Sequence, residues 1–293
     1  MRFNVQFDGF SLRGFSLGGI ETQVYVPEFK LAFDVGRGRE SLLRCDHLAL
    51  THLHMDHVGG LPYLLALRQL YGMKPPTVYV PAQVSDALVA MLAAWKPLQR
   101  YDLAVNIVPV VPGTRYPLRR GLWLEPFRTY HPVVSNGYSV VQVVEKLAPE
   151  FHGLSGPEIV ALKKKGVAIT RSQERVLLSV TGDTLVQVLD KHPALYQSEV
   201  LILECTFLDA SKPLDKAHAG GHVHLDDLMP RLANFENRTL ILSHFSQMHS
   251  PADIARLLAP VAKILQPELR ALAVSPDAPN PIGDPPSDVL EET

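Results

Sequence analysis

The sequence predicts an α/β fold, in which a β-rich opening is followed by strands and helices that alternate to the end of the chain. Three observations support this class. The first residues show the alternating, β-branched and aromatic pattern of a β-meander. Helical spacing then appears on both sides of a short apolar strand. Three strand-then-helix units follow, and each of their strands ends in an acidic or histidine residue, at the sheet edge where α/β proteins place their sites.

The expected elements follow in chain order. The opening strands, separated by Gly-rich turns, are residues 2–7, 22–26 and 30–35. A short buried strand at 45–50 then runs into a histidine-rich loop. Helices are expected at 61–72 and 85–95, on either side of a strand at 77–81, and a strand-rich stretch at about 104–145. The closing units pair strands at 176–183, 199–207 and 239–245 with helices at 184–189, 224–233 and 251–265.

Length and composition indicate an ordinary globular protein. The chain has 293 residues, 46% of them hydrophobic and 20% charged, enough to bury a large core. No apolar stretch approaches the roughly 18 to 20 residues of a membrane span, and the N-terminus lacks a signal peptide pattern. We therefore expect a cytoplasmic protein without membrane contact. We expect one domain over residues 1–273 and a Pro- and Asp-rich tail over 274–293 that is disordered or loosely wrapped around it.

Charge and cysteine content restrict the possible partners. Cys45 and Cys205 are expected to be buried thiols, because two isolated cysteines cannot form a disulfide framework. With a net charge of −2, nucleic-acid binding would need a local basic patch. The only notable one lies in the polar segment 150–175, which is either a solvated helix face or a docking surface for a phosphate-rich substrate. Its basic residues are Lys163, Lys164, Lys165, Arg171 and Arg175.

The histidine-rich loop predicts a metal site. His52, His54, Asp56 and His57 place three imidazoles and a carboxylate within six residues. Such nitrogen and oxygen ligands suit zinc, manganese or iron better than calcium or magnesium. Four ligands packed this tightly cannot all reach one ion, so we expect the first two histidines to face one metal and the Asp–His pair a second. Two glycines follow and are expected to let the backbone turn sharply.

Two ions need more ligands, and the ends of other strands supply candidates. These are His131, Asp183 and His244. Taken singly, His131 could be a loop histidine, Asp183 a turn or N-cap residue, and His244 a capping or core histidine. With the loop at 52–57 they make one set of seven ligands.

This arrangement resembles the metallo-β-lactamase superfamily, and several details are similar to its ribonuclease Z branch, the tRNA 3′-processing endonucleases. The details are Phe33-Asp34-Val35-Gly36, His131 followed by Gly137-Tyr138, Leu203-Glu204-Cys205-Thr206-Phe207, Gly221-His222 and Leu242-Ser243-His244-Phe245-Ser246. The similarity covers about residues 20–250. It implies an αββα sandwich, with two mixed β-sheets flanked by helices.

The resemblance also implies roles for the ligands. His52, His54 and His131 would bind one zinc, Asp56, His57 and His244 the other, and Asp183 would bridge them. The cofactors would be two Zn²⁺, with Mn²⁺ or Fe²⁺ as alternatives. Asp34 would be an acceptor that orients a ligand histidine, although from the residues alone it could equally be a turn residue.

The implied chemistry is attack on phosphorus by a hydroxide held between two metals. Asp56 would orient this nucleophile and take its proton. His222 would protonate the leaving oxygen or stabilise the pentacoordinate state, with Glu204 holding its tautomer. Since His218, His222 and His224 lie within seven residues, any one of them could act, and Gly221-His222 matches the family pattern best.

The resemblance leaves more than one class of substrate open. Relatives that process tRNA carry a long arm before the Gly182-Asp183 turn, and the 52 positions between His131 and Asp183 predict a short hairpin or helix instead. Two enzymatic hypotheses follow: a phosphodiesterase acting on RNA such as precursor tRNA, or a hydrolase of small phosphodiesters, esters or lactones. Salt dependence would distinguish them. A non-enzymatic interaction protein is a third hypothesis, tested by metal content. By analogy with the family we expect a homodimer.

Overall fold

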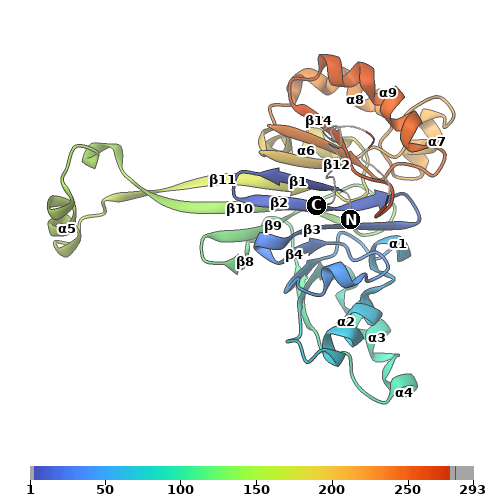
Figure 1. The fold of residues 1–293 in the computed structure, drawn as a ribbon, viewed down its shortest axis with the longest axis horizontal. Coiled ribbons are helices and arrows are strands. Elements are labelled where there is room, and N and C mark those ends of the chain that lie inside the picture. The colour runs from blue at the N-terminus through green and yellow to red at the C-terminus, as the bar shows by residue number, and fades with distance from the viewer. Residues whose placement is uncertain (1–2, 278–280, 282–293) are drawn as a thin grey trace, which may run out of the picture.

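The computed structural model describes residues 3–277 and 281, and two seven-stranded sheets dominate it (Figure 1). The first sheet contains, in spatial order, β1 (Asn4–Phe7), β2 (Phe10–Leu17), β3 (Glu21–Val26), β4 (Leu31–Phe33), β5 (His47–Ala49), β6 (Thr77–Pro81) and β7 (Asn106–Val110). The second contains β14 (Glu268–Ala271), β13 (Thr239–Ser243), β12 (Val200–Glu204), β11 (Thr170–Val180), β10 (Asn136–Leu147), β9 (Leu122–Arg128) and β8 (Tyr116–Arg119).

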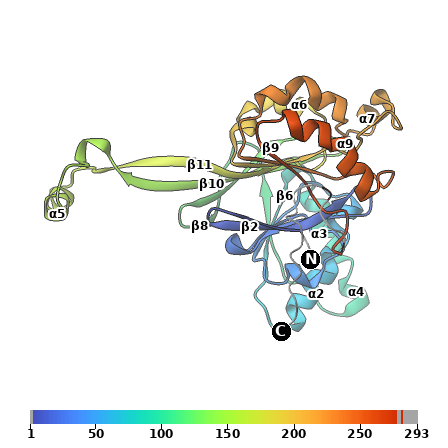
Figure 2. The ribbon, with the colours of Figure 1, turned by 45° about the horizontal axis from the view of Figure 1, so that its top comes forward.

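Helices cover the outer face of each sheet (Figure 2). The first sheet is flanked by α1 (Met55–Val58), α2 (Leu61–Leu70), α3 (Ser85–Ala93) and α4 (Lys96–Gln99). The second is flanked by α6 (Gln187–Lys191), α7 (Leu214–Ala219), α8 (Leu225–Leu228) and α9 (Pro251–Ile264). Three buried apolar clusters separate these four layers: one between the sheets and one beneath each set of helices. This is the αββα sandwich that the resemblance implied.

Both sheets are mixed in the same way, and this positions the functional site. Strands β1 to β4 and β8 to β11 pair antiparallel, whereas β4 to β7 and β11 to β14 pair parallel. Parallel strands end at a common edge of their sheet. The loops that follow β5, β11, β12 and β13 therefore meet at one end of the sandwich.

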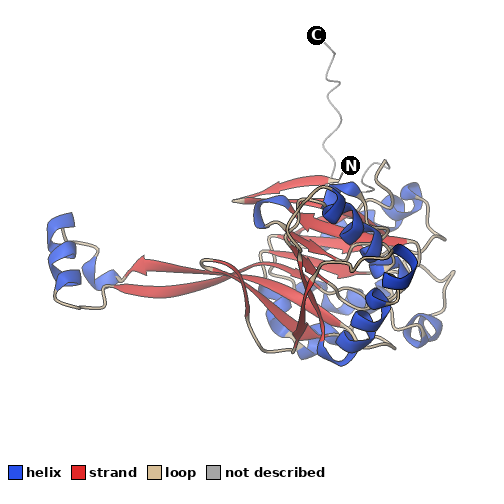
Figure 3. Cartoon of the chain, turned by 90° about the horizontal axis from the view of Figure 1, so that it is seen from below, coloured by secondary structure: helices blue, strands red, loops and turns tan. Residues whose placement is uncertain are grey.

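A long hairpin leaves the opposite end of the sandwich (Figures 1 and 3). Strands β10 and β11 pair from Tyr138–Val180 to Leu147–Thr170, and helix α5 (Gly156–Lys164) lies at the tip. At about 3.3 Å per residue, the paired rows alone extend for roughly 30 Å. We call residues 141–176 the arm. The sequence-based expectation of a short hairpin or helix was wrong, because an antiparallel ribbon needs few residues to reach far.

Strands β11 and β2 were incompletely predicted, for physical reasons, and β14 was not predicted at all. Residues 170–175 of β11 are exposed, since the arm stands in solvent and neither face of the ribbon is buried. Without a buried face there is no apolar alternation to detect. Strand β2 was assigned to a Gly-rich turn, yet Gly14 lies within it. A Cβ there would lie 2.4 Å from the Gln23 carbonyl oxygen, so this glycine permits close strand contact rather than a turn.

The remaining expectations concern the cysteines, the membrane and the tail. Both Cys45 and Cys205 are free and buried, as predicted. Among the described residues, no helix combines the length and apolar character required to cross a bilayer. The predicted disordered tail at 274–293 lies mostly outside the described residues, and Val274, at its start, packs against the core beneath α9.

Candidate metal centre

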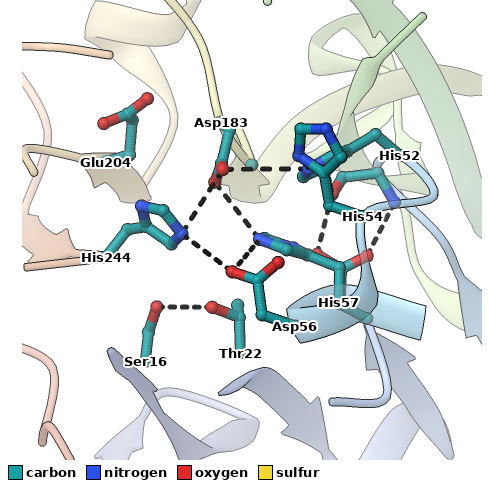
Figure 4. A network of polar contacts seen from close by, with 12 residues as sticks. Ser16, Thr22, His52, His54, Asp56, His57, Asp183, Glu204 and His244 are labelled. Carbon is teal, nitrogen blue, oxygen red and sulfur yellow. Dashed lines mark hydrogen bonds and ion pairs between the residues drawn. The ribbon is translucent and has the colours of Figure 1, made fainter. Parts of the chain in front are cut away.

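The predicted ligands come together near α1, which lies at the end of the sandwich opposite the arm in Figure 1, and Figure 4 labels all of them except His131. Strand β5 leads into His52 and His54, and α1 supplies Asp56 and His57. The turn after β11 carries Asp183, and His244 follows β13 directly. His131 comes from the loop between β9 and β10. The two sheets thus contribute ligands from both sides of a single cluster.

Three overlapping groups of side chains could each hold an ion, and the third of them consists of Asp183, His222 and His244. His52, His54, His131 and Asp183 form the first group, and Asp56, His57 and His244 form the second. In each group the ligand atoms lie within 4.8 Å of one another. Asp183 also reaches the second group, because its Oδ1 lies 3.4 Å from His57 Nε2 and its Oδ2 3.3 Å from His244 Nε2. Its position between the groups suits a bridging carboxylate.

The polar atoms of this cluster fit metal ions better than they fit one another. His57 Nε2, His244 Nε2 and Asp183 Oδ1 are buried without a hydrogen-bond partner. Burying such atoms unpaired is costly, and nitrogen with carboxylate oxygen is the donor set of zinc, manganese and iron sites. His54 Nδ1 lies only 3.0 Å from His52 Nε2 and 3.3 Å from His131 Nε2. Three ring nitrogens that converge in this way match one face of a coordination shell.

Four of the histidines are held in place by hydrogen bonds at Nδ1, the ring nitrogen that faces away from the cluster. His57 Nδ1–H donates to Asp34 (2.7 Å), and His52 Nδ1–H to the Thr51 hydroxyl (3.0 Å). The other two bonds run from His131 Nδ1–H to the Gly221 carbonyl (3.1 Å) and from His244 Nδ1–H to the Thr206 hydroxyl (3.0 Å). Each ring therefore presents Nε2 to the cluster in one tautomer, the usual arrangement around metal ligands.

Of these hydrogen-bond partners of the histidines, Asp34 accepts the most hydrogen bonds. Its carboxylate also accepts from the Thr51 backbone N–H and hydroxyl, both at 2.8 Å. Its backbone is left-handed, with φ 55°, and so is that of His244, with φ 62°. A non-glycine residue pays for this conformation and keeps it only where the surroundings demand it. Asp34 therefore orients His57, and it is not merely a turn residue.

The two carboxylates of the cluster are kept ionised. Burial alone would raise the pKa of Asp56, but the His244 and His57 imidazoles, whose Nε2 atoms lie 3.5 Å from Asp56 Oδ2, hold it well below its usual range. Burial opposes ionisation of Asp183 in the same way, and the charges of His244 and His57 lower its pKa instead. Both groups are thus anionic, as ligands for a divalent cation must be.

Beside the cluster, Glu204 and His222 form a linked pair. His222 Nδ1 lies 3.1 Å from Glu204 Oε1. The carboxylate also accepts from the backbone N–H of Thr184 (2.7 Å) and the hydroxyl of Thr206 (2.6 Å), which fixes its position. Burial lowers the pKa of His222, but the Glu204 charge outweighs it and raises that pKa to about 9. The ring of His222 is therefore protonated at neutral pH.

The structure separates the three neighbouring histidines. His222 lies with its ring centroid 5.2 Å from that of His131, within the site. His218 instead contacts Asp227 at 2.9 Å. His224 is buried, accepts the N–H of Asp226 at the start of α8, and has its Nε2 3.0 Å from the Asp209 carbonyl. Only His222 faces the cluster.

Sequence inspection missed several supporting groups. Thr51 and Thr206 lie in stretches that were singled out, but neither received a role. Gly221 was noted only as a neighbour of His222, yet it supplies a carbonyl to His131 and has φ 77°. The two glycines after His57 form the turn between α1 and α2, as expected, but with ordinary helical φ values of −55° at Gly59 and −85° at Gly60. Gly60 is instead needed for close packing, because a Cβ there would lie 1.9 Å from the backbone carbon of Arg37.

Comparison with known proteins gives consistent matches. Residues 24–245 match the family model described as the beta-lactamase superfamily domain. The chain is 36% identical to tRNase Z TRZ1 of Arabidopsis thaliana, over 92% of this chain and 96% of that protein. It is 35% identical to the chloroplastic tRNase Z TRZ2 of the same plant, over 86% and 72%.

Solved structures share the fold at lower identity. The crystal structure of the short form of human tRNase Z superposes with a TM-score of 0.55 at 21% identity, covering 81% of this chain and 93% of that one. The metallo-β-lactamase fold protein YhfI of Bacillus subtilis superposes with a TM-score of 0.63 at 15% identity, covering 92% and 98%. These likenesses support the fold alone.

Proposed function

Because this chain belongs to the tRNase Z family of the metallo-β-lactamase superfamily, we propose that it is a metal-dependent phosphodiesterase that cleaves RNA, with precursor tRNA as the expected substrate. The observation that carries the proposal is the placement of a two-metal ligand cluster and a basic arm tip at opposite ends of one molecule (Figure 1). A substrate that touches both must span at least about 30 Å, roughly nine base pairs of duplex. RNA meets this requirement and a small phosphodiester does not.

The arm tip carries free positive charge. Lys163, Lys164 and Lys165 end helix α5 and are exposed, and no carboxylate of the described chain lies within ion-pair distance of them. Of the other basic residues in this segment, Arg171 pairs with Glu150 and Arg175 with Glu199. The three lysines are therefore available to phosphates.

Residues of the cluster would hold two divalent cations, which we propose to be zinc, with manganese or iron also compatible. When bound, such ions supply a nucleophile at neutral pH and offset charge on the phosphoryl oxygen. His52, His54 and His131 would bind one ion, Asp56, His57 and His244 the other, with Asp183 between them.

The chain's own groups then orient the reactants and move protons. Asp56 Oδ2 accepts the N–H of Gly19 at 3.0 Å, which fixes the carboxylate that would align the nucleophile and take its proton. His222, protonated and turned by Glu204, would donate a proton to the leaving oxygen. Both roles are proposals.

The experiment compares two substrates and two proteins. In the variant, residues 148–169 are replaced by an Asn-Gly turn that joins Leu147 to Thr170, which are paired at the root of the tip. With zinc or manganese, the wild type is expected to cleave both a precursor tRNA transcript and bis(p-nitrophenyl) phosphate. The variant should keep the small-substrate rate and lose most of its RNA cleavage. Metal-loaded wild-type protein that cleaves only the small substrate would support the alternative hydrolase.

We also propose a cytoplasmic homodimer. Both cysteines are unpaired, as is usual in reducing compartments. Large apolar side chains are exposed on α2 and near α4: Tyr63, Leu70, Tyr71, Trp95, Leu98 and Tyr101. Such a surface is typical of subunit contacts. Light scattering should give twice the chain mass for the wild type and a single chain mass for Leu70→Glu with Leu98→Glu, and imaging of a tagged full-length chain would test the compartment.

A further inference from the structure

We infer that Arg128 and Tyr130 form a nucleotide subsite beside the metal centre, in which the Arg128 guanidinium binds the phosphate adjacent to the scissile one. The inference rests on the proposed RNA cleavage and names a contact that cleavage would use. Arg128 ends strand β9, three residues before His131. It is exposed, and its guanidinium stacks over the ring of Tyr130 at 5.5 Å from the centroid.

Arg128 has no carboxylate partner among the described residues; Arg119, Arg120 and Arg238 share this feature, but none of them lines the two pockets beside His131. Arg115 pairs with Glu125 and Glu174, and Arg231 pairs with Asp190. A guanidinium that is held by an aromatic ring but not neutralised is well suited to bind a phosphate.

The Arg128–Tyr130 pair is anchored to the loop that carries the proposed metal ligand Asp183. The Tyr130 N–H donates to the Thr184 hydroxyl at 2.9 Å, and the Tyr130 carbonyl accepts from the Leu185 N–H at 2.9 Å. Thr184 follows Asp183 directly and is itself bonded to Glu204. These hydrogen bonds of Tyr130 therefore fix the backbone of the Arg128–Tyr130 segment relative to Asp183.

Two pockets meet at Arg128. The larger has a volume of about 430 Å³ and an apolar wall formed by Pro112, Pro132, Val133 and Val134. The other has a volume of about 320 Å³ and includes Tyr130 and His218. Both are also lined by Arg128 and His131, and neither is lined by an acidic residue.

This combination specifies the ligand. Positive charge without acidic neighbours favours an anion, and the apolar wall of the larger pocket offers a surface to the face of a base. Val133 and Val134, exposed by 39% and 40%, would be covered by it. The subsite therefore takes one nucleotide of the RNA next to the cleaved bond, with its phosphate on Arg128 and its base in the larger pocket.

The test removes the charge from each partner in turn. RNA oligonucleotides carry a neutral methylphosphonate in place of the phosphate on one side or the other of the cleavage site, and kcat/KM is measured for wild type and Arg128→Gln. A charge-assisted contact is worth about 10- to 100-fold. We expect the methylphosphonate on one of the two sides to lower the kcat/KM of the wild type by that factor. On the unmodified RNA, Arg128→Gln should have a kcat/KM lower than that of the wild type by the same factor.

On that modified RNA the two proteins should cleave at similar rates. Arg120→Gln is the control, because Arg120 is exposed and lies just before the other end of β9. A methylphosphonate penalty that is the same in wild type and Arg128→Gln would overturn the subsite while leaving RNA cleavage intact. Failure of the wild type to cleave any RNA would instead overturn the proposed function.

Discussion

The arm-tip lysines offer a quantitative prediction about RNA binding. Replacing Lys163, Lys164 and Lys165 by Gln removes three exposed charges that have no carboxylate partner in the described chain. If each lysine binds one phosphate, the negative slope of log affinity against log salt should become less steep by about 2.7, at roughly 0.9 per contact. The helix should persist, because its capping box at Ser155 and Glu158 is untouched.

The loss of affinity depends on salt in a way that can be calculated. With a slope difference of about 2.7 and equal affinities at 1 M salt, binding to a precursor tRNA should weaken roughly 170-fold at 0.15 M salt and only about 6-fold at 0.5 M. The first value corresponds to about 3 kcal/mol. Hydrolysis of bis(p-nitrophenyl) phosphate should not change, because the arm tip lies at the far end of the molecule from the metal centre (Figure 1).

Fluorescence anisotropy with labelled RNA across a salt series provides the assay. The matched control is Lys74→Gln with Arg238→Gln and Lys263→Gln, which removes the same charge from exposed positions of the sandwich outside the arm. If this control and the arm-tip variant had the same slope, RNA binding would depend on overall charge, and the reasoning about the arm would be refuted.

Three further predictions concern the metal centre. Asp34→Asn removes the carboxylate behind His57 and should weaken metal binding about 10- to 100-fold in a chelator competition; unchanged affinity would show that Asp34 is dispensable. In metal-free protein the pKa of His222, about 9, is raised above its unfolded value, so its contribution to stability is complete below about pH 6.5 and is lost as pH rises through 9. Glu204→Gln should bring that pKa down in an NMR titration and flatten the pH dependence of stability over this range, whereas an unmoved titration would rule out the pairing. In Gly221→Ala the new Cβ would lie 2.2 Å from the Pro132 ring, and residue 221 would have to keep its left-handed φ of 77°. The substitution should lower the free energy of unfolding by about 1–3 kcal/mol and reduce cleavage. A fully active, equally stable variant would contradict the close contact.

Some parts of the fold and site could be predicted because they depend on local spacing. His52 to His57 lie within one loop and its following turn, so their proximity is settled by chain connectivity. Asp183 and His244 were predicted because a residue that ends a parallel strand must lie at the same sheet edge as other strand ends. Burial on both faces likewise made β12 and β13 visible as continuous apolar runs.

Other parts depend on contacts between residues far apart in the chain. No local pattern shows that Thr206 supports His244, or that the Gly221 carbonyl meets His131 across 90 positions. The choice of His222 over its neighbours was also decided by packing, because His218 and His224 have other partners.

The sequence by itself determined that His52 to His57 lie close together, and it determined the class of fold, since these follow from residue order and from burial periodicity. Only the tertiary structure revealed the arm, whose solvent-exposed strands carry no such periodicity. It also revealed which ring nitrogen each histidine presents, because a tautomer is selected by the hydrogen-bond partner behind the ring, and that partner comes from another part of the chain.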